Sequence, residues 1–245
     1  QTDVAGNVSQ TSHALTLVTT RNATVVVAPT SLDLAANDDS GLSSSDNITK
    51  TSRGLTISGI GTKDAKVTLF NDKNSNNQMD KDESLGSVEV HSATGQWNKE
   101  ISIPSGTHAI RAVQTSHQVV SVASDALLIT VDTTAPSAPS LGSSSLTLVG
   151  MGEVGAMVTL FEDLNSNGKK DSNEKILGGT TCLVSGNGSW ASGHVLSTLK
   201  SGKHAMRAFQ TDRAGNVSPV SGVLSLSIAA ASKRVDLSSP ATIFV

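Results

Sequence analysis

Cysteine and aromatic residues are scarce in this sequence. Its 245 residues include one cysteine, Cys182, and very few aromatic residues: four Phe, two Trp and no Tyr. A single cysteine excludes a disulfide within the chain, so in an oxidising compartment something else must stabilise the domains. The shortage of aromatic side chains argues against binding of single-stranded nucleic acid, which relies on base stacking. The net charge of −3 also provides no strong field for a polyanion. We therefore expect no nucleic-acid partner.

Long apolar runs and catalytic patterns are missing as well. No apolar run approaches the ~20 residues that a membrane-spanning helix needs, so we expect a chain that does not span a membrane. No Ser–His–Asp order is repeated, no glycine-rich phosphate loop follows an expected strand, and no Cys or His cluster has zinc spacing. The sequence predicts a protein that is not an enzyme and has no catalytic residues.

The chain does contain an internal repeat, the first feature to look for in any sequence. The stretch Gln1–Ser9 returns almost unchanged as Gln210–Ser218, and Val67–Phe70 returns as Val158–Phe161. The repeat divides the chain into the end of a preceding repeat, two whole repeats, and a final stretch that is a linker or the start of another segment. The expected boundaries of these four stretches are 1–28, 29–131, 132–228 and 229–245.

Short β-branched runs alternate with clusters of Gly, Asn, Asp and Ser within each repeat. In the middle repeat this pattern predicts strands near residues 30–35, 54–58, 66–70, 84–90, 97–103, 107–115 and 119–131. Short strands with turn signals about every 8–12 residues are typical of an immunoglobulin-type sandwich. We expect an all-β fold of tandem immunoglobulin-like antiparallel β-sandwiches, seven strands each, in a linear array. Trp97 and Trp190 are expected in the two cores.

A polar loop follows the Val-Thr-Leu-Phe strand in both whole repeats. The side chains at loop positions 1, 3, 5, 7, 9 and 12 are, in the first loop, Asp72, Asn74, Asn76, Gln78, Asp80 and Glu83. In the second loop they are Asp163, Asn165, Asn167, Lys169, Asp171 and Glu174. This is the ligand spacing of an EF-hand loop, in which position 7 supplies only a backbone carbonyl. The alternative is an ordinary Asn-rich surface loop. Because two copies match at these offsets, the sequence favours one Ca²⁺ site in each loop.

A second group of polar residues is expected at the junction of the two whole repeats. In a sandwich, the connection between the first two strands lies at the pole that faces the next repeat, and the turn between the last two strands lies at the opposite pole. The residues that these rules bring to one junction are Asp38, Asp39, Asp46, Asp132, Asp212 and Asn216. They predict a Ca²⁺ ion shared between domains. For the stretch 212–216 the alternative is an Asx turn in which glycine supplies a positive φ.

These motifs together resemble those of a known family. The linker Asp132–Pro139, the turn Asp212–Ser218, the acidic segment Asp38–Thr49 and the Gly-x-Trp strands resemble the bacterial Ig-like repeats of giant adhesins exported by type I secretion. The resemblance covers residues 1–228. It implies a virulence-associated cell-adhesion protein that is secreted and displayed on the bacterial surface, built as a rod of repeats stiffened by calcium.

The resemblance also implies partners. These are the neighbouring repeats of the same chain and the host-cell surface, with glycans as one class of ligand, and the chain is expected to be a monomer. Two other functions remain open at this stage. A carbohydrate-binding module should expose aromatic side chains, and accessory domains of a secreted enzyme would show no catalytic residues of their own.

Overall fold

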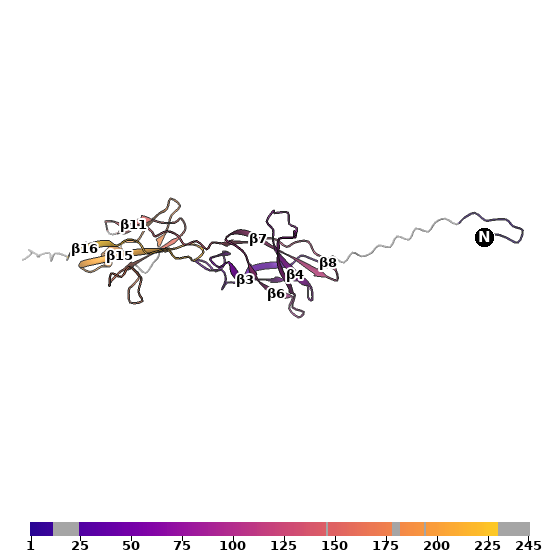
Figure 1. The fold of residues 1–245 in the computed structure, drawn as a ribbon, viewed down its shortest axis with the longest axis horizontal. Coiled ribbons are helices and arrows are strands. Elements are labelled where there is room, and N and C mark those ends of the chain that lie inside the picture. The colour runs from indigo at the N-terminus through magenta and orange to yellow at the C-terminus, as the bar shows by residue number, and fades with distance from the viewer. Residues whose placement is uncertain (12–24, 146, 178–181, 194, 230–245) are drawn as a thin grey trace, which may run out of the picture.

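Two β-sandwiches follow one another along the chain. The computed structural model describes residues 1–11, 25–145, 147–177, 182–193 and 195–229. The ribbon places the two sandwiches end to end, the first in purple to magenta and the second in orange to yellow (Figure 1). Strands and loops make up nearly all of the described residues, so the expected all-β, immunoglobulin-like class is confirmed.

The first sandwich consists of two sheets. Its strands are β1 (Thr30–Leu34), β2 (Ile48–Thr49), β3 (Arg53–Ile60), β4 (Lys66–Asn71), β5 (Ser84–Glu89), β6 (Gln96–Ser102), β7 (Gly106–Ser116), β8 (Val119–Val120) and β9 (Leu127–Val131). One sheet has the order β1-β3-β6, and the other has the order β2-β9-β7-β4-β5 with β8 paired to β7. The pairings are antiparallel except for the short parallel pairing of β2 with β9.

The second sandwich repeats this plan with shorter elements. They are β10 (Gly142–Ser144), β11 (Thr147–Met151), β12 (Met157–Glu162), β13 (Cys182–Leu183), β14 (Ser189–Ala191), the 3₁₀ helix η2 (Val195–Thr198), β15 (Gly202–Thr211) and β16 (Leu224–Ile228). Its sheets have the orders β10-β11-β14 and β13-β12-β15-β16.

Alternation of apolar and polar residues builds a separate core in each sandwich. In β3, for example, Leu55 and Ile57 are fully buried while Thr56 and Ser58 are partly exposed, as the two-residue period of a strand requires. Trp97 lies in the first core and Trp190 in the second, with 4% and 3% of their surfaces exposed. The expectation of two buried tryptophans is confirmed, and neither indole offers a face to a sugar.

Two details differ from the expected strands. The strand expected at 119–131 is split into β8 and β9. Between these strands, Ser121 and Ser124 bond to β7 through their side-chain hydroxyls as well as their backbone N–H groups. Ser121 Oγ accepts the N–H of Gln114, and Ser124 Oγ accepts the N–H of Ala112, so these serines replace the regular ladder. Strand β2 was not expected. It lies within the connection between β1 and β3 and pairs with the last strand of the sandwich.

Candidate functional site

The first polar loop joins β4 to β5 and is organised by a buried aspartate. Asp72 is 4% exposed, and its Oδ1 accepts the backbone N–H of Asn76 at 3.1 Å. Its Oδ2 accepts the N–H of Asn77 at 3.2 Å and Nε of Arg111 at 2.9 Å. The loop can fold this tightly because Ser75 and Asn77 adopt positive φ angles of 58° and 61°. The carboxylate at position 1 of the loop is therefore held in place by protein atoms alone.

The other end of the loop is held by a buried glutamate. Glu83 is 3% exposed and accepts two backbone N–H groups, that of Lys73 at Oε1 (2.8 Å) and that of Asp80 at Oε2 (3.1 Å). Between the two ends, the side-chain amides of Asn74 and Asn76 donate to Asp80 Oδ2 at 2.8 and 3.1 Å. Hydrogen bonds thus connect the residues at positions 1, 3, 5, 9 and 12 within one loop.

The second loop, which follows β12, begins in the same way. Asp163 is 2% exposed, with Oδ1 accepting the N–H of Asn167 (3.1 Å) and Oδ2 accepting the N–H of Gly168 (3.0 Å) and Nε of Arg207 (2.7 Å). Burial alone would raise the pKa of Asp163, but the hydrogen bonds from Arg207 and from the two backbone N–H groups outweigh it and hold the pKa below its ordinary value.

The remaining positions of the second loop also match those of the first. Glu174 accepts the N–H of Leu164 at 2.8 Å and that of Asp171 at 2.9 Å. Asn165 and Asn167 donate to Asp171 Oδ2 at 2.8 and 2.7 Å. The two loops therefore share one hydrogen-bond pattern although most of their other residues differ.

The residues at position 7 contribute through the backbone. The N–H of Gln78 donates to Asn76 Oδ1, and the N–H of Lys169 donates to Asn167 Oδ1, both at 2.7 Å. The carbonyl ligand expected at position 7 stays a prediction, since these bonds use the N–H groups.

Sequence reasoning missed the arginine beneath each loop. Arg111 and Arg207 occupy equivalent positions in β7 and β15, and each bonds to the first aspartate of its loop. Each also donates Nη1 to a serine carbonyl in the stretch before the last strand, at 2.7 Å to Ser124 and 2.9 Å to Ser221. The signal was present in the sequence, because both arginines belong to the repeated His-Ala-x-Arg-Ala stretch.

Direct hydrogen bonds join the two sandwiches at the junction. They run from Ser40 Oγ to Ala214 O (2.8 Å), from Leu42 N to Arg213 O (3.3 Å), from Lys50 Nζ to Gly215 O (2.9 Å) and from Asn216 Nδ2 to Asp132 O (2.7 Å). The turn 212–216 therefore lies against the acidic segment of the first sandwich, where the sequence placed it. Lys50 and Arg213 were not among the expected junction residues.

Several expected junction carboxylates bond to nearby backbone N–H groups. These bonds join Asp38 to Thr56, Asp39 to Asn47, Asp46 to Ile48, Asp132 to Thr134 and Asp212 to Asn216. Asp39 is 3% exposed, and within the described residues its Oδ1 has no hydrogen-bond partner. Of the Asx-type turn considered for residues 212–216, the positive φ of glycine is present at Gly215 (93°), but Asp212 Oδ1 accepts the N–H of Asn216, four residues on rather than two.

One further carboxylate belongs to this junction. Desolvation raises the pKa of Glu153, and the negative charges of Asp212 and Asp132 raise it further. The carboxylates of Asp212 and Asp132 therefore repel that of Glu153 at this junction. Sequence reasoning missed Glu153 because its counterpart in the first repeat, Thr62, carries no charge.

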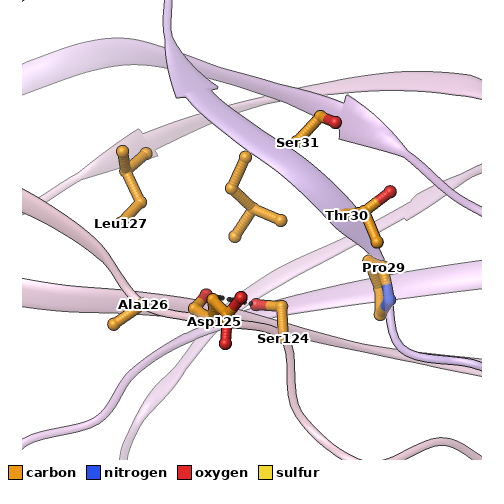
Figure 2. A pocket seen from close by; sticks show the side chains of 8 residues that line it. Pro29, Thr30, Ser31, Ser124, Asp125, Ala126 and Leu127 are labelled. Carbon is orange, nitrogen blue, oxygen red and sulfur yellow. Dashed lines mark hydrogen bonds between the residues drawn. The ribbon is translucent and has the colours of Figure 1, made fainter.

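Other features of the described chain offer little for chemistry. Among the described residues, no three His, Cys, Asp or Glu side chains are grouped as a metal site, and no helix is long and apolar enough to cross a membrane. A pocket of about 240 Å³ lies between the start of β1 and the segment before β9 (Figure 2). Asp125 is the charged residue in its lining, and Ser124 Oγ donates to the carbonyl of that residue.

Comparisons with known proteins indicate only a general likeness of fold. No family model and no curated protein matches the sequence. Among solved structures, the BSP domain of a biofilm-associated protein is 19% identical (TM-score 0.29), with 85% of this chain and 30% of that chain covered. A tetra-tandem repeat from the extending region of a large adhesion protein is 19% identical (TM-score 0.32), with 76% and 48% covered. Fibronectin(III)-like modules of Clostridium thermocellum CbhA are 10% identical (TM-score 0.41), with 82% and 95% covered. The chain thus spans less than a third of the solved BSP-domain chain and about half of the solved adhesion repeat.

Proposed function

We propose that this chain is a calcium-binding segment of a giant secreted bacterial surface adhesin, in which tandem sandwiches form a rod that contributes to attachment to host epithelial cells. The combination of sequence motifs most resembles the giant non-fimbrial adhesin of Salmonella. The observation that carries the calcium part of the proposal is the pair of loops, because the two form the same hydrogen bonds at the same six positions. Ordinary surface loops have no reason to keep such a pattern twice.

The donors of each loop suit a hard cation. Ca²⁺ takes six to eight oxygen ligands in irregular geometry, and each loop offers two aspartates, two asparagines, one glutamate and a backbone carbonyl. In the first loop, Asn74 and Asn76 now present their amide nitrogens to Asp80. A half-turn of each amide would present the oxygens instead, so the residues fit the ion after a small rearrangement. The buried carboxylates of Asp72 and Glu83 would complete the site.

The loop residues would then have distinct roles. The first aspartate is positioned by its arginine and keeps one oxygen, Oδ1 of Asp72 or Asp163, toward the loop interior. The glutamate at position 12 ties the two ends of the loop together through backbone N–H groups. A bound ion supplies positive charge that offsets the repulsion among the three carboxylates of the loop. Binding only to the folded state stabilises each sandwich by mass action.

At the junction, the same charge argument supports a shared ion. The carboxylates of Asp212 and Asp132 repel that of Glu153, and Asp39 Oδ1 is a buried oxygen without a partner among the described residues. A cation shared by such groups would favour the docked arrangement of the two sandwiches. A rod of this kind holds its tip away from the cell, whereas sandwiches joined by a free linker can bend.

The test is thermal unfolding of the whole chain with calcium or with chelator. Variants Trp97→Phe and Trp190→Phe leave one tryptophan each, so the fluorescence reports one sandwich at a time. For weak sites with a Kd of about 10⁻⁴–10⁻³ M, about 10 mM calcium should stabilise each sandwich by about 1.4–2.7 kcal/mol per site. Equal midpoints in calcium, magnesium and chelator for both reporters would overturn the calcium proposal.

A further inference from the structure

The two sandwiches meet at a pair of glycines. Gly41 lies in the segment between β1 and β2, and Gly215 lies in the turn between β15 and β16. A Cβ added to Gly215 would lie 2.9 Å from Gly41 Cα and 3.0 Å from Gly41 N. A Cβ added to Gly41 would overlap the carbonyl oxygen of Arg213. The backbones therefore approach so closely that neither position has room for a side chain.

Hydrogen bonds surround this contact and use the backbone carbonyls of the turn. The carbonyl oxygens of Arg213, Ala214 and Gly215 accept donors from the first sandwich, namely Leu42 N, Ser40 Oγ and Lys50 Nζ respectively. A turn normally leaves such carbonyls to water, so three successive ones bonded to one neighbouring segment indicate a fitted surface. Arg213 also lies 3.5 Å from Asp46, but an ion pair this exposed contributes little to docking.

We propose that Gly41 and Gly215 form a docking contact that fixes how the second sandwich sits on the first. The turn Asp212–Asn216 is the inserted element, and the segment Asp38–Thr51 is the surface that receives it. The partner that this turn recognises is thus a neighbouring repeat whose connection between its first strands carries a glycine at the position of Gly41. The inference rests on the proposed rod but concerns protein contacts, not the ion.

A second copy of the turn shows that its shape does not depend on docking. In residues 3–7, Asp3 Oδ1 accepts the N–H of Asn7 (2.9 Å), Asn7 Nδ2 donates to Asp3 Oδ2 (2.9 Å) and Gly6 has a φ of 90°. The corresponding values in the docked turn are 2.8 Å, 2.8 Å and 93°. A Cβ added to Gly6 meets no atom of the described chain within 4 Å. The turn is therefore preformed and ready to dock.

The first sandwich lacks this element at its own opposite pole. There β7 and β8 are joined through His117 and Gln118, with φ angles of 49° and 66°. Two consecutive side chains occupy the tip where the docking turn has Ala214 and Gly215. A repeat of this type could not approach a receiving segment as closely. The sequence of this one turn therefore separates repeats that dock from repeats that do not.

The test measures the spread of distances between spin labels at Glu100→Cys and Lys203→Cys, exposed positions on different sandwiches, in a Cys182→Ala background of the whole chain. In calcium, Gly215→Ala and Gly41→Ala should widen the distance distribution about twofold, because free movement is the default once an interdomain contact is lost. Gly6→Ala is the matched control, since it places alanine at nearly the same positive φ with no neighbour to meet.

The outcomes separate the two proposals. If the distance distributions of Gly215→Ala and Gly41→Ala are as narrow as that of Gly6→Ala, the docking contact is wrong. This conclusion does not depend on the result in chelator. If chelator leaves the distance distribution of the chain without glycine substitutions unchanged, the shared junction ion is ruled out but the docking contact is not. If Gly215→Ala unfolds the second sandwich, as tryptophan fluorescence would show, the double variant Lys50→Met, Asn216→Ala replaces it. That variant removes two junction bonds without backbone strain and should also widen the distribution.

Discussion

The side-chain amide of Gln210 binds the linker that enters its own sandwich, with Nε2 donating to the carbonyl of Ser137 at 2.7 Å. Gln210 is 2% exposed, and its Oε1 accepts the N–H of Glu153 at 3.0 Å. The first sandwich repeats the arrangement, with Gln114 Nε2 donating to Val27 O and Oε1 accepting the N–H of Thr62. One buried amide in each sandwich therefore anchors the incoming chain.

Replacing Gln210 by alanine should destabilise the second sandwich and loosen the linker. The change leaves the Glu153 N–H and the Ser137 carbonyl without their partner, and a buried unpaired polar group costs about 1–3 kcal/mol. Urea unfolding followed through Trp190 measures the loss. Lys203→Ala, at an exposed strand position of the same sandwich, is the control and should change stability by less than about 0.5 kcal/mol. Equal losses in the two variants would contradict the anchoring role.

The anchoring glutamines show what the sequence could and could not predict. The repeat of Gln1–Ser9 as Gln210–Ser218 was visible in the sequence, and Gln210 lies next to the last residue of β15. Its partners were not predictable, since Ser137 lies 73 residues away from Gln210 and contributes only a backbone carbonyl. Backbone acceptors carry no residue signature.

The same limit applies to the junction. The topology of a sandwich was enough to place Asp212 near the acidic segment of the first sandwich. The glycine pair and the role of Lys50 were not predicted, because close backbone approach depends on the relative orientation of two domains. The loops were the opposite case. Their spacing alone marked the side chains at positions 1, 3, 5, 9 and 12, which hydrogen bonds connect within each loop, because the geometry of a tight turn is local.

Removing the arginine beneath a loop should destabilise its sandwich. Arg207 supplies a charged donor to Asp163, whose side chain is fully buried, and hydrogen bonds to charged groups contribute about 1.5–3 kcal/mol. Arg207→Met should lower the free energy of unfolding by about this amount in chelator. The single variant Asp163→Asn and the double variant Asp163→Asn, Arg207→Met complete a double-mutant cycle, which measures the coupling energy between the two side chains. A coupling near zero would show that the pair does not hold the loop.

The second sandwich should lose stability as the pH rises through the titration of His204. Its Nε2 bonds the carbonyl of Lys200 and its Nδ1 lies 2.8 Å from Glu162 Oε1. The Lys200 carbonyl and then the Glu162 carboxylate raise the pKa of His204 in spite of burial. Because the pKa of His204 is higher in the folded state than in the unfolded state, protonation of His204 stabilises the folded state. The stabilisation is therefore full below the unfolded value of about 6.5 and is lost as the pH rises through the folded pKa.

The experiment compares thermal midpoints between about pH 6 and pH 8 in chelator, where the imidazole titrates. The unmodified chain should melt earlier at the higher pH in the Trp190 signal. Glu162→Gln should reduce this pH dependence. The first sandwich has the neutral amide of Asn71 in place of Glu162, at 3.0 Å from Nδ1 of His108, and serves as an internal comparison. A pH dependence that survives in both Glu162→Gln and His204→Gln would assign it to another group.

Each loop should lose its own calcium when its last glutamate is removed. Glu83→Ala deletes the carboxylate at position 12 and frees the two backbone N–H groups that it ties together, so both the ligand and the loop closure are lost. Calorimetric titration should then show one loop site fewer, with the second loop unaffected, and Glu174→Ala should give the converse result.

Asp82→Asn is the matched control. It removes an exposed carboxylate of the first loop, 3.0 Å from Lys73 Nζ, that lies outside the ligand positions. Because the nearby negative charge is reduced by one, the control should weaken binding only slightly and keep the stoichiometry. If Glu83→Ala behaves like Asp82→Asn, the glutamate is not a ligand and the EF-hand interpretation of the spacing is wrong.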